Sequence, residues 1–112
     1  GAKVLILGVA YKGNIDDYRE SPALRVIEEF QKVGSEVEYY DPFVPEYKEK
    51  GRTMKGLTEL SAATIQNSDI VVITTNHTWG IDYNFVQQNA RYVFDTKNAM
   101  KNITNRENVE LL

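Results

Sequence analysis

The chain of 112 residues contains no cysteine and only one histidine, His77. The absence of cysteine excludes a disulfide, a thiolate metal site and a cysteine nucleophile within this chain. A lone histidine, with no second ligand at metal-binding spacing, does not form a zinc site. We therefore predict no metal site, and we assign no catalytic residue to the chain.

A net positive charge and long hydrophobic runs are also absent. The net charge is −3, whereas domains that bind nucleic acid are usually basic, so we expect no nucleic-acid partner. No apolar run approaches the roughly 18 residues of a membrane span, so we expect no membrane partner. The 42% of hydrophobic and 26% of charged residues are typical of a globular protein. The length suffices for one domain, residues 1–112.

Apolar strand patterns alternate with helical patterns along the chain. The predicted strands are 3–7, 36–40, 69–74, 91–95 and 109–112. Three helices are predicted. The first follows the N-cap Ser21, the second runs from Leu57 to Gln66 with Thr58 as a candidate cap, and the third runs from Tyr83 to Asn89. This alternation predicts a Rossmann-like three-layer α/β/α domain with a mostly parallel sheet of five or six strands.

Within that sheet we predict the strand order 3-2-1-4-5, with residues 3–7 and 69–74 in central positions. The segment Val44–Gly56 is polar and rich in charge, and we interpret it as a loop with a short helical turn. Residues 109–112 would form an edge strand.

The connection Gly8–Pro22 is the most informative stretch. It follows the apolar strand Val4–Leu7 and precedes an amphipathic helix, so it lies at the carboxyl end of a strand, where open α/β sheets bind ligands. Gly8 and Gly13 do not form the Gly-x-Gly-x-x-Gly dinucleotide fingerprint. We therefore expect that this chain does not bind NAD in the usual mode.

Three motifs resemble one known family. They are Gly8-Val9-Ala10-Tyr11-Lys12 followed by Asn14-Ile15-Asp16-Asp17 and Arg19-Glu20-Ser21-Pro22, then Tyr39-Tyr40-Asp41-Pro42-Phe43-Val44-Pro45, and finally Val93-Phe94-Asp95-Thr96-Lys97-Asn98. The chain resembles, over nearly all of its length, the carboxyl-terminal UDP-binding domain of the UDP-glucose/GDP-mannose dehydrogenase family. The first motif is most similar to the branch that oxidises UDP-N-acetylhexosamines.

The resemblance implies three substrate-binding residues. Lys12 matches a lysine that contacts the UDP part of the substrate, as a point charge suited to phosphate. Tyr11 could lay its ring against the uracil or the sugar, or be a partly buried aromatic at the end of the strand. Lys97 stands where the family usually has an arginine, and it cannot make the planar bidentate contact of a guanidinium.

Asp17, Arg19 and Glu20 admit two interpretations. They either form an internal ion pair that shapes the loop or face another half of a larger enzyme. For Asp41 we favour a rigid turn over cofactor binding, and for His77 we favour a role in loop structure.

The resemblance also implies a function. The chain would bind and position the substrate of an NAD-dependent, cytoplasmic 6-dehydrogenase that oxidises a UDP-N-acetylhexosamine, or UDP-glucose, to the uronic acid. Gly1 directly before a strand suggests a boundary within a longer polypeptide. Its amino-terminal half would bind NAD and carry the catalytic cysteine, and the full enzyme would be a homo-oligomer. By itself the chain would be inactive. The alternatives are a stand-alone nucleotide-sensing module and a protein-interaction module.

Overall fold

The computed structural model describes residues 1–112 and shows one five-stranded parallel sheet. Its strands are β1 (Lys3–Leu7), β2 (Glu36–Tyr40), β5 (Ile70–Ile73), β6 (Val93–Asp95) and β7 (Val109–Leu111). The helices are α1 (Pro22–Lys32), α2 (Ala62–Asn67) and α3 (Tyr83–Asn89). The predicted α/β class and parallel sheet are confirmed. None of these helices combines the length and apolar character needed to cross a membrane.

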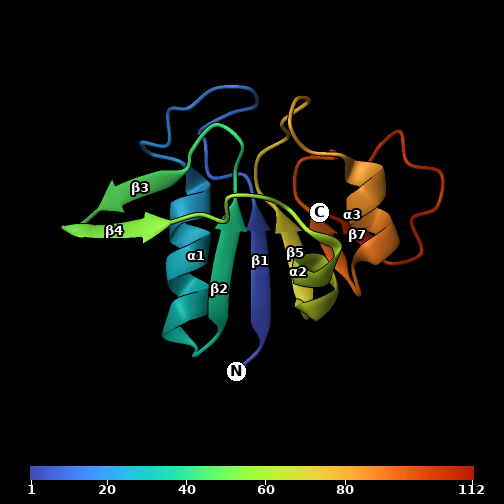
Figure 1. The fold of residues 1–112 in the computed structure, drawn as a ribbon, viewed down its shortest axis with the longest axis horizontal. Coiled ribbons are helices and arrows are strands. Elements are labelled where there is room, and N and C mark those ends of the chain that lie inside the picture. The colour runs from blue at the N-terminus through green and yellow to red at the C-terminus, as the bar shows by residue number, and fades with distance from the viewer.

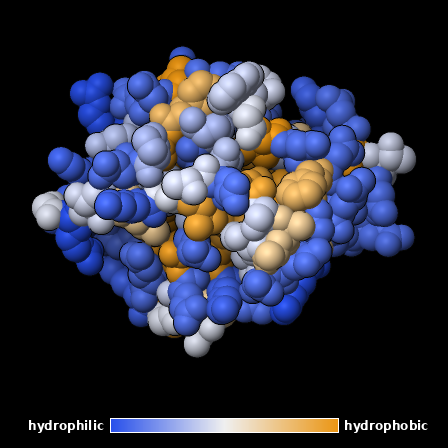
Figure 2. Space-filling view, viewed as in Figure 1, coloured by the Kyte–Doolittle hydropathy of each residue, from blue (hydrophilic) through white to orange (hydrophobic).

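Two hydrophobic cores lie on opposite faces of the sheet. Along β1, Val4 and Ile6 pack into the core that includes α1 residues, whereas Leu5 and Leu7 pack into the core of α2 and α3. This alternation follows from the two-residue period of a strand. Helices therefore cover both faces, as predicted (Figure 1). On the face shown in Figure 2, hydrophobic residues gather in patches near the middle and at the upper edge, and most of the remaining periphery is hydrophilic.

The strand order is β2-β1-β5-β6-β7, so the predicted order 3-2-1-4-5 is wrong. The predicted order places the third strand of the sheet, β5, on the outer side of β2. In the structure β5 pairs with β1 instead. Val71, Val72 and Ile73 are all buried, which requires neighbours on both sides and cover on both faces. In β2, Glu36 and Glu38 are exposed, and a strand that presents charges to water suits an edge.

The segment predicted as a loop with a helical turn is instead a β-hairpin. Strands β3 (Glu46–Glu49) and β4 (Arg52–Lys55) pair antiparallel across a turn at Lys50 and Gly51. Both turn residues have positive φ, 53° and 77°, which matches the twist of a tight hairpin. The many charged residues of this segment obscured its strand pattern, which depends on the inward-facing Tyr47. The centroid of the Tyr47 ring lies 5.4 Å from that of Tyr39.

One helix boundary differs from its prediction, and two helices agree. The helix predicted from Leu57 begins only at Ala62, because Ser61, and not Thr58, is the N-cap and accepts from the Thr64 amide at 3.2 Å. Helix α1 begins after Ser21 as expected, and Gly34 (φ 87°) ends it in the left-handed conformation. Helix α3 has the predicted bounds, with Asp82 as its N-cap.

Candidate functional site

The carboxyl edge of the sheet contains a topological switch point between β1 and β5. From β1 the chain continues to β2 on one side, and it then returns to β5 on the other side of β1. Open α/β sheets bind ligands at such a point, because the two outgoing loops diverge there. The loops in question are residues 8–21 after β1 and residues 74–82 after β5, both at the upper end of the sheet in Figure 1.

In this protein the two loops meet closely. A Cβ atom on Gly8 would lie 2.4 Å from the Thr75 side chain, and one on Gly13 would lie 2.1 Å from the Asn76 carbonyl oxygen. Gly8 also has a φ of 92°, which a larger residue rarely adopts. The two glycines therefore serve loop–loop packing, which explains why they lack the dinucleotide spacing.

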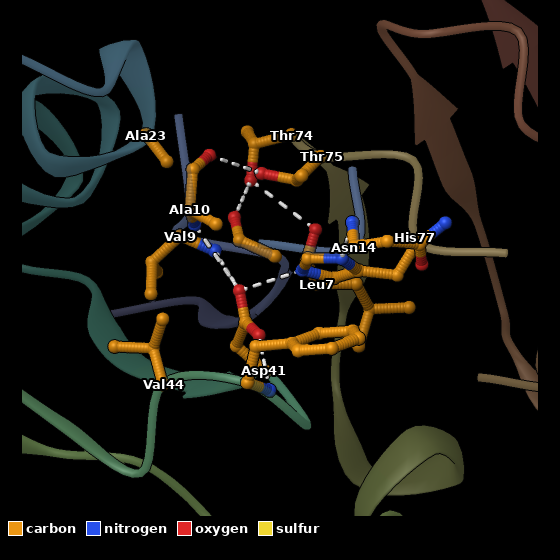
Figure 3. Close-up of polar contacts among 12 residues, drawn as sticks. Leu7, Val9, Ala10, Asn14, Ala23, Asp41, Val44, Thr74, Thr75 and His77 are labelled. Carbon is orange, nitrogen blue, oxygen red and sulfur yellow. Dashed lines mark hydrogen bonds and ion pairs between the residues drawn. The ribbon is translucent and has the colours of Figure 1, made fainter. Parts of the chain in front are cut away.

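Asp41, at the end of β2, ties these loops together from beneath. Its carboxylate is buried and accepts hydrogen bonds from the amides of Val9 at 2.8 Å and Ala10 at 3.1 Å. His77 Nε2 lies 2.8 Å from Asp41 Oδ2 (Figure 3). Burial alone would raise the pKa of the Asp41 carboxyl, but the hydrogen bonds from His77 and from backbone amides hold it below its ordinary value.

Hydroxyl groups complete this attachment. Thr75 Oγ1 donates to the Ala10 carbonyl at 2.8 Å, and Thr74 Oγ1 donates to the carbonyl of Gly8. Ser21, the N-cap of α1, also donates to the Ala10 carbonyl, at 3.3 Å. Ala10 is thus fixed at both its amide and its carbonyl. Sequence reasoning assigned Asp41 and His77 to architecture, but it did not find that they are partners.

The amino terminus of α1 reaches this edge, and its first three positions offer no free amide to an anion. Pro22 has no N–H, and Ala23 N donates to the Ser21 hydroxyl at 3.2 Å. Leu24 N donates to the Ser21 carbonyl at 3.2 Å. A pyrophosphate bound as in a dinucleotide fold uses these donors. Because these donors are already used, cationic side chains are the stronger candidates to meet an anion at this edge.

The structure places the predicted residues on this edge in three separate positions. Tyr11, Asp17, Arg19 and Glu20 line one open pocket. Lys97 lines a different groove with Thr74, Thr96 and apolar residues of α1 and the sheet. Lys12 is exposed at the tip of the first loop and lines neither. The structure therefore does not bring the predicted residues together into one enclosed site.

Within the first pocket, Asp17 and Arg19 form a two-pronged ion pair. Arg19 Nε and Nη2 lie 3.1 and 3.2 Å from the two oxygens of Asp17. The side-chain hydrogen bond from Arg19 lowers the pKa of the Asp17 carboxyl. Glu20 has a φ of 61°, which is uncommon outside glycine. The Tyr11 side chain is 56% exposed, so its ring is available to a ligand.

Lys97 is held from below by another buried carboxylate. Asp95 accepts from the amides of Lys97 at 3.1 Å, Ala99 at 3.0 Å and Met100 at 2.9 Å. The aspartate of the third motif is therefore structural, and it leaves the Lys97 side chain exposed at the edge. Within the chain, no group of three or more histidine, aspartate or glutamate side chains is placed to hold a metal ion.

The fold and this edge define a doubly wound α/β domain of the nucleotide-binding type. Residues 5–102 match the UDP-glucose/GDP-mannose dehydrogenase family, UDP binding domain. The chain belongs to this family.

Named relatives agree with the family match. The chain is 37% identical over 111 residues to UDP-N-acetyl-D-mannosamine dehydrogenase of Methanocaldococcus jannaschii, covering 94% of this chain and 24% of that protein. It is 29% identical to UDP-glucose 6-dehydrogenase of Rickettsia bellii, covering 90% and 25%. The solved structure of the UDP-D-ManNAc dehydrogenase from Pyrococcus horikoshii is similar with a TM-score of 0.71 and 26% identity, covering 98% and 25%. The chain spans about a quarter of the length of these relatives.

Proposed function

We propose that this chain binds the UDP part of a UDP-N-acetylhexosamine at the carboxyl edge of its sheet. The single observation that carries the proposal is the loop after β1. At the switch point it presents the exposed Lys12, while the amides of Ala23 and Leu24 at the start of α1 already donate to Ser21. A lysine ammonium provides a compact positive charge for a diphosphate. Tyr11 provides an aromatic face, and Lys97 a second cation on the same edge.

The proposed substrate class follows from the relatives. UDP-N-acetyl-D-mannosamine dehydrogenases match over most of this chain, and UDP-glucose 6-dehydrogenases match at lower identity. We therefore propose an N-acetylhexosamine as the sugar and regard glucose as the competing candidate. On this proposal the reaction is the NAD-dependent oxidation of C6 to the uronic acid, in the cytoplasm.

The chemistry itself is assigned to another part of a longer polypeptide. An amino-terminal half, which would bind NAD, is proposed as the partner that completes the cleft, and the complete enzyme as a homo-oligomer. Asp17, Arg19 and Glu20 line a pocket that such a half could face. Binding energy from the nucleotide then serves to position the sugar for a reaction that this chain does not perform.

The proposal is tested by titrating the chain with UDP and following backbone amide signals by NMR, which measures affinities as weak as millimolar. We expect signals of the loops at residues 8–21 and 74–82 to shift. Charge-assisted hydrogen bonds contribute about 1.5–3 kcal/mol, so Lys12→Ala should raise the Kd by about 10- to 100-fold.

Lys55→Ala is the matched control, because it removes the same charge from the exposed strand β4. Lys97→Ala should have a smaller effect than Lys12→Ala. If Lys12→Ala binds UDP within about twofold of the parent, Lys12 is not in the site. If the parent gives no saturable shift, the chain does not bind UDP and the proposed function is wrong.

A further inference from the structure

One buried imidazole, that of His77, joins the loop that carries Lys12 to the loop after β5. We call this connection the clasp. The His77 side chain is fully buried. Its Nδ1 accepts a hydrogen bond from the Asn14 amide at 2.8 Å, and its Nε2 lies 2.8 Å from Asp41 Oδ2. Figure 3 shows the imidazole between these two residues. Both ring nitrogens are therefore in use, and neither is free for a ligand.

These partners fix the tautomer. A backbone amide can only donate, so Nδ1 must carry a lone pair. The proton then lies on Nε2 and is donated to the Asp41 carboxylate. Two further contacts hold His77 in place: the centroid of the Phe43 ring lies 4.9 Å from that of the imidazole, and the Tyr83 hydroxyl accepts from the His77 backbone amide at 3.1 Å.

Asn14 extends the clasp on the exposed side. Its Oδ1 accepts from the amides of Thr78 at 3.0 Å and Trp79 at 3.2 Å, and its Nδ2 donates to Thr78 Oγ1 at 2.6 Å. Its φ is 62°. Asparagine tolerates this left-handed conformation better than most residues, yet the conformation persists only where the surroundings determine it.

In the sequence Lys12 lies between two backbone amides, those of Ala10 and Asn14, that are both linked to the Asp41 carboxylate. On one side, Ala10 N donates to Asp41 Oδ2. On the other side, Asn14 N reaches the same Asp41 oxygen through the imidazole of His77. Only three residues separate these two anchors, so the backbone of Lys12 has little freedom while both hold.

We infer that His77 is the positioning residue of the nucleotide site. Through its bond to the Asn14 amide it holds residues 11–14 in the conformation that presents Lys12 to the diphosphate of the ligand. This inference rests on the proposed function of Lys12. It assigns a role to His77 without any contact between His77 and the ligand.

Two substitutions separate positioning from simple structural support. In His77→Asn the side-chain oxygen replaces Nδ1 and can accept from the Asn14 amide, but the bond to Asp41 is lost. In His77→Gln the side-chain amide replaces Nε2 and can donate to Asp41, but the bond to Asn14 is lost. Each variant loses one hydrogen bond, and His77→Asn leaves the larger cavity, so a purely structural role predicts that His77→Asn loses at least as much stability and affinity as His77→Gln.

A positioning role predicts a split between the two variants. We expect His77→Gln to raise the Kd for UDP at least tenfold and to speed hydrogen exchange at the amides of residues 12–14. His77→Asn should bind UDP within about threefold of the parent. In the parent, ¹⁵N NMR of the ring should show a protonated Nε2 and an unprotonated Nδ1. Equal Kd values for the two variants, or a proton on Nδ1, would overturn the inference.

Asn14→Gly tests the side-chain bonds of Asn14 without disturbing the core, and it keeps the backbone amide that donates to His77. Glycine adopts the left-handed backbone without strain, so this variant should fold, while the three side-chain bonds to residues 78 and 79 are lost. We expect it to raise the Kd for UDP severalfold. The matched control is Lys50→Gly, another residue with positive φ (53°), in the distant hairpin turn; it should leave the Kd unchanged.

The outcomes distinguish this inference from the proposed function. If the parent binds UDP and Lys12→Ala weakens binding, but His77→Gln and Asn14→Gly bind as the parent does, only the positioning role is wrong. If the parent does not bind UDP, the proposed function is wrong and this inference with it.

Discussion

At the scale of single residues, Asp41 is a buried carboxylate whose hydrogen-bond partners replace water on all sides. Its carboxylate is buried, and it is stabilised by three backbone amides and one imidazole. A buried charge is tolerated only when such partners replace water. Because the partners come from the loops after β1, β2 and β5, this one side chain links three segments that are far apart in the sequence.

Asp41→Asn should lower the free energy of unfolding at pH 7 by about 3 kcal/mol. The substitution removes the negative charge and replaces one acceptor oxygen with an NH2 group, so the backbone amides and the imidazole that donate to Asp41 lose part of their partner. Urea unfolding followed by circular dichroism measures this. The exposed Glu59→Gln is the control and should stay within about 0.5 kcal/mol of the parent. A loss below about 1 kcal/mol for Asp41→Asn would contradict the assignment.

Asp41 also predicts the sign of a pH dependence. Its folded-state pKa is lowered from the ordinary value of 3.8. Its contribution to stability is therefore complete above the unfolded pKa and is lost as the pH falls through the folded pKa. The parent should lose stability as the pH falls below about 5, and Asp41→Asn should lose less over the same range. Parallel curves for the two proteins would show that Asp41 is not responsible.

At the scale of elements, the close approach of the two loops determines the shape of the edge. The Gly13 backbone passes so near the Asn76 carbonyl that no side chain fits between them. Asp17 adds an internal restraint, since its carbonyl accepts from the Tyr11 amide at 2.6 Å while its carboxylate binds Arg19. The loop after β1 is therefore a defined structure despite its length and polarity.

Gly13→Ala should force the two loops apart. Inserting a methyl group into a packed contact costs about 1–3 kcal/mol, and the displaced loop should bind UDP at least fivefold more weakly. Gly51→Ala is the matched control. Gly51 has a φ of 77° but open space around it, so the variant pays only backbone strain of about 1 kcal/mol and should keep the parent Kd. An equal Kd for Gly13→Ala and the parent would contradict the role of this contact.

At the scale of the whole molecule, the proposed function assigns to this chain the binding of substrate and not the chemistry. It has no cysteine and no dinucleotide fingerprint, and it spans about a quarter of the length of its relatives. The purified chain should therefore give no NAD reduction with UDP-N-acetylmannosamine, UDP-N-acetylglucosamine or UDP-glucose, as followed by absorbance at the wavelength of NADH. Turnover above the level of a protein-free blank would contradict this expectation.

The local sequence determined most of the elements. Local residue types at short spacing account for the apolar run Val4–Leu7 of β1, the Ser21-Pro22 start of α1 and the bounds of α3. A strand period, an N-cap and a helix period are local properties. The three motifs also identified the family. The hairpin β3–β4 was missed because its inward-facing residues are few among many charges, and its burial depends on Tyr39 and Tyr18.

Tertiary structure alone decided which strands are neighbours in the sheet and which loop residues are in contact. The order of the strands depends on which edges and faces become buried, and no local pattern encodes that competition. The pairing of Asp41 with His77, 36 positions apart, and the clasp of Asn14 to residues 77–79 exist only once β1, β2 and β5 end at one edge. The sequence by itself determined that Lys12 follows a strand; the packing of the two loops decided the backbone contacts on either side of Lys12, at Ala10 and Asn14.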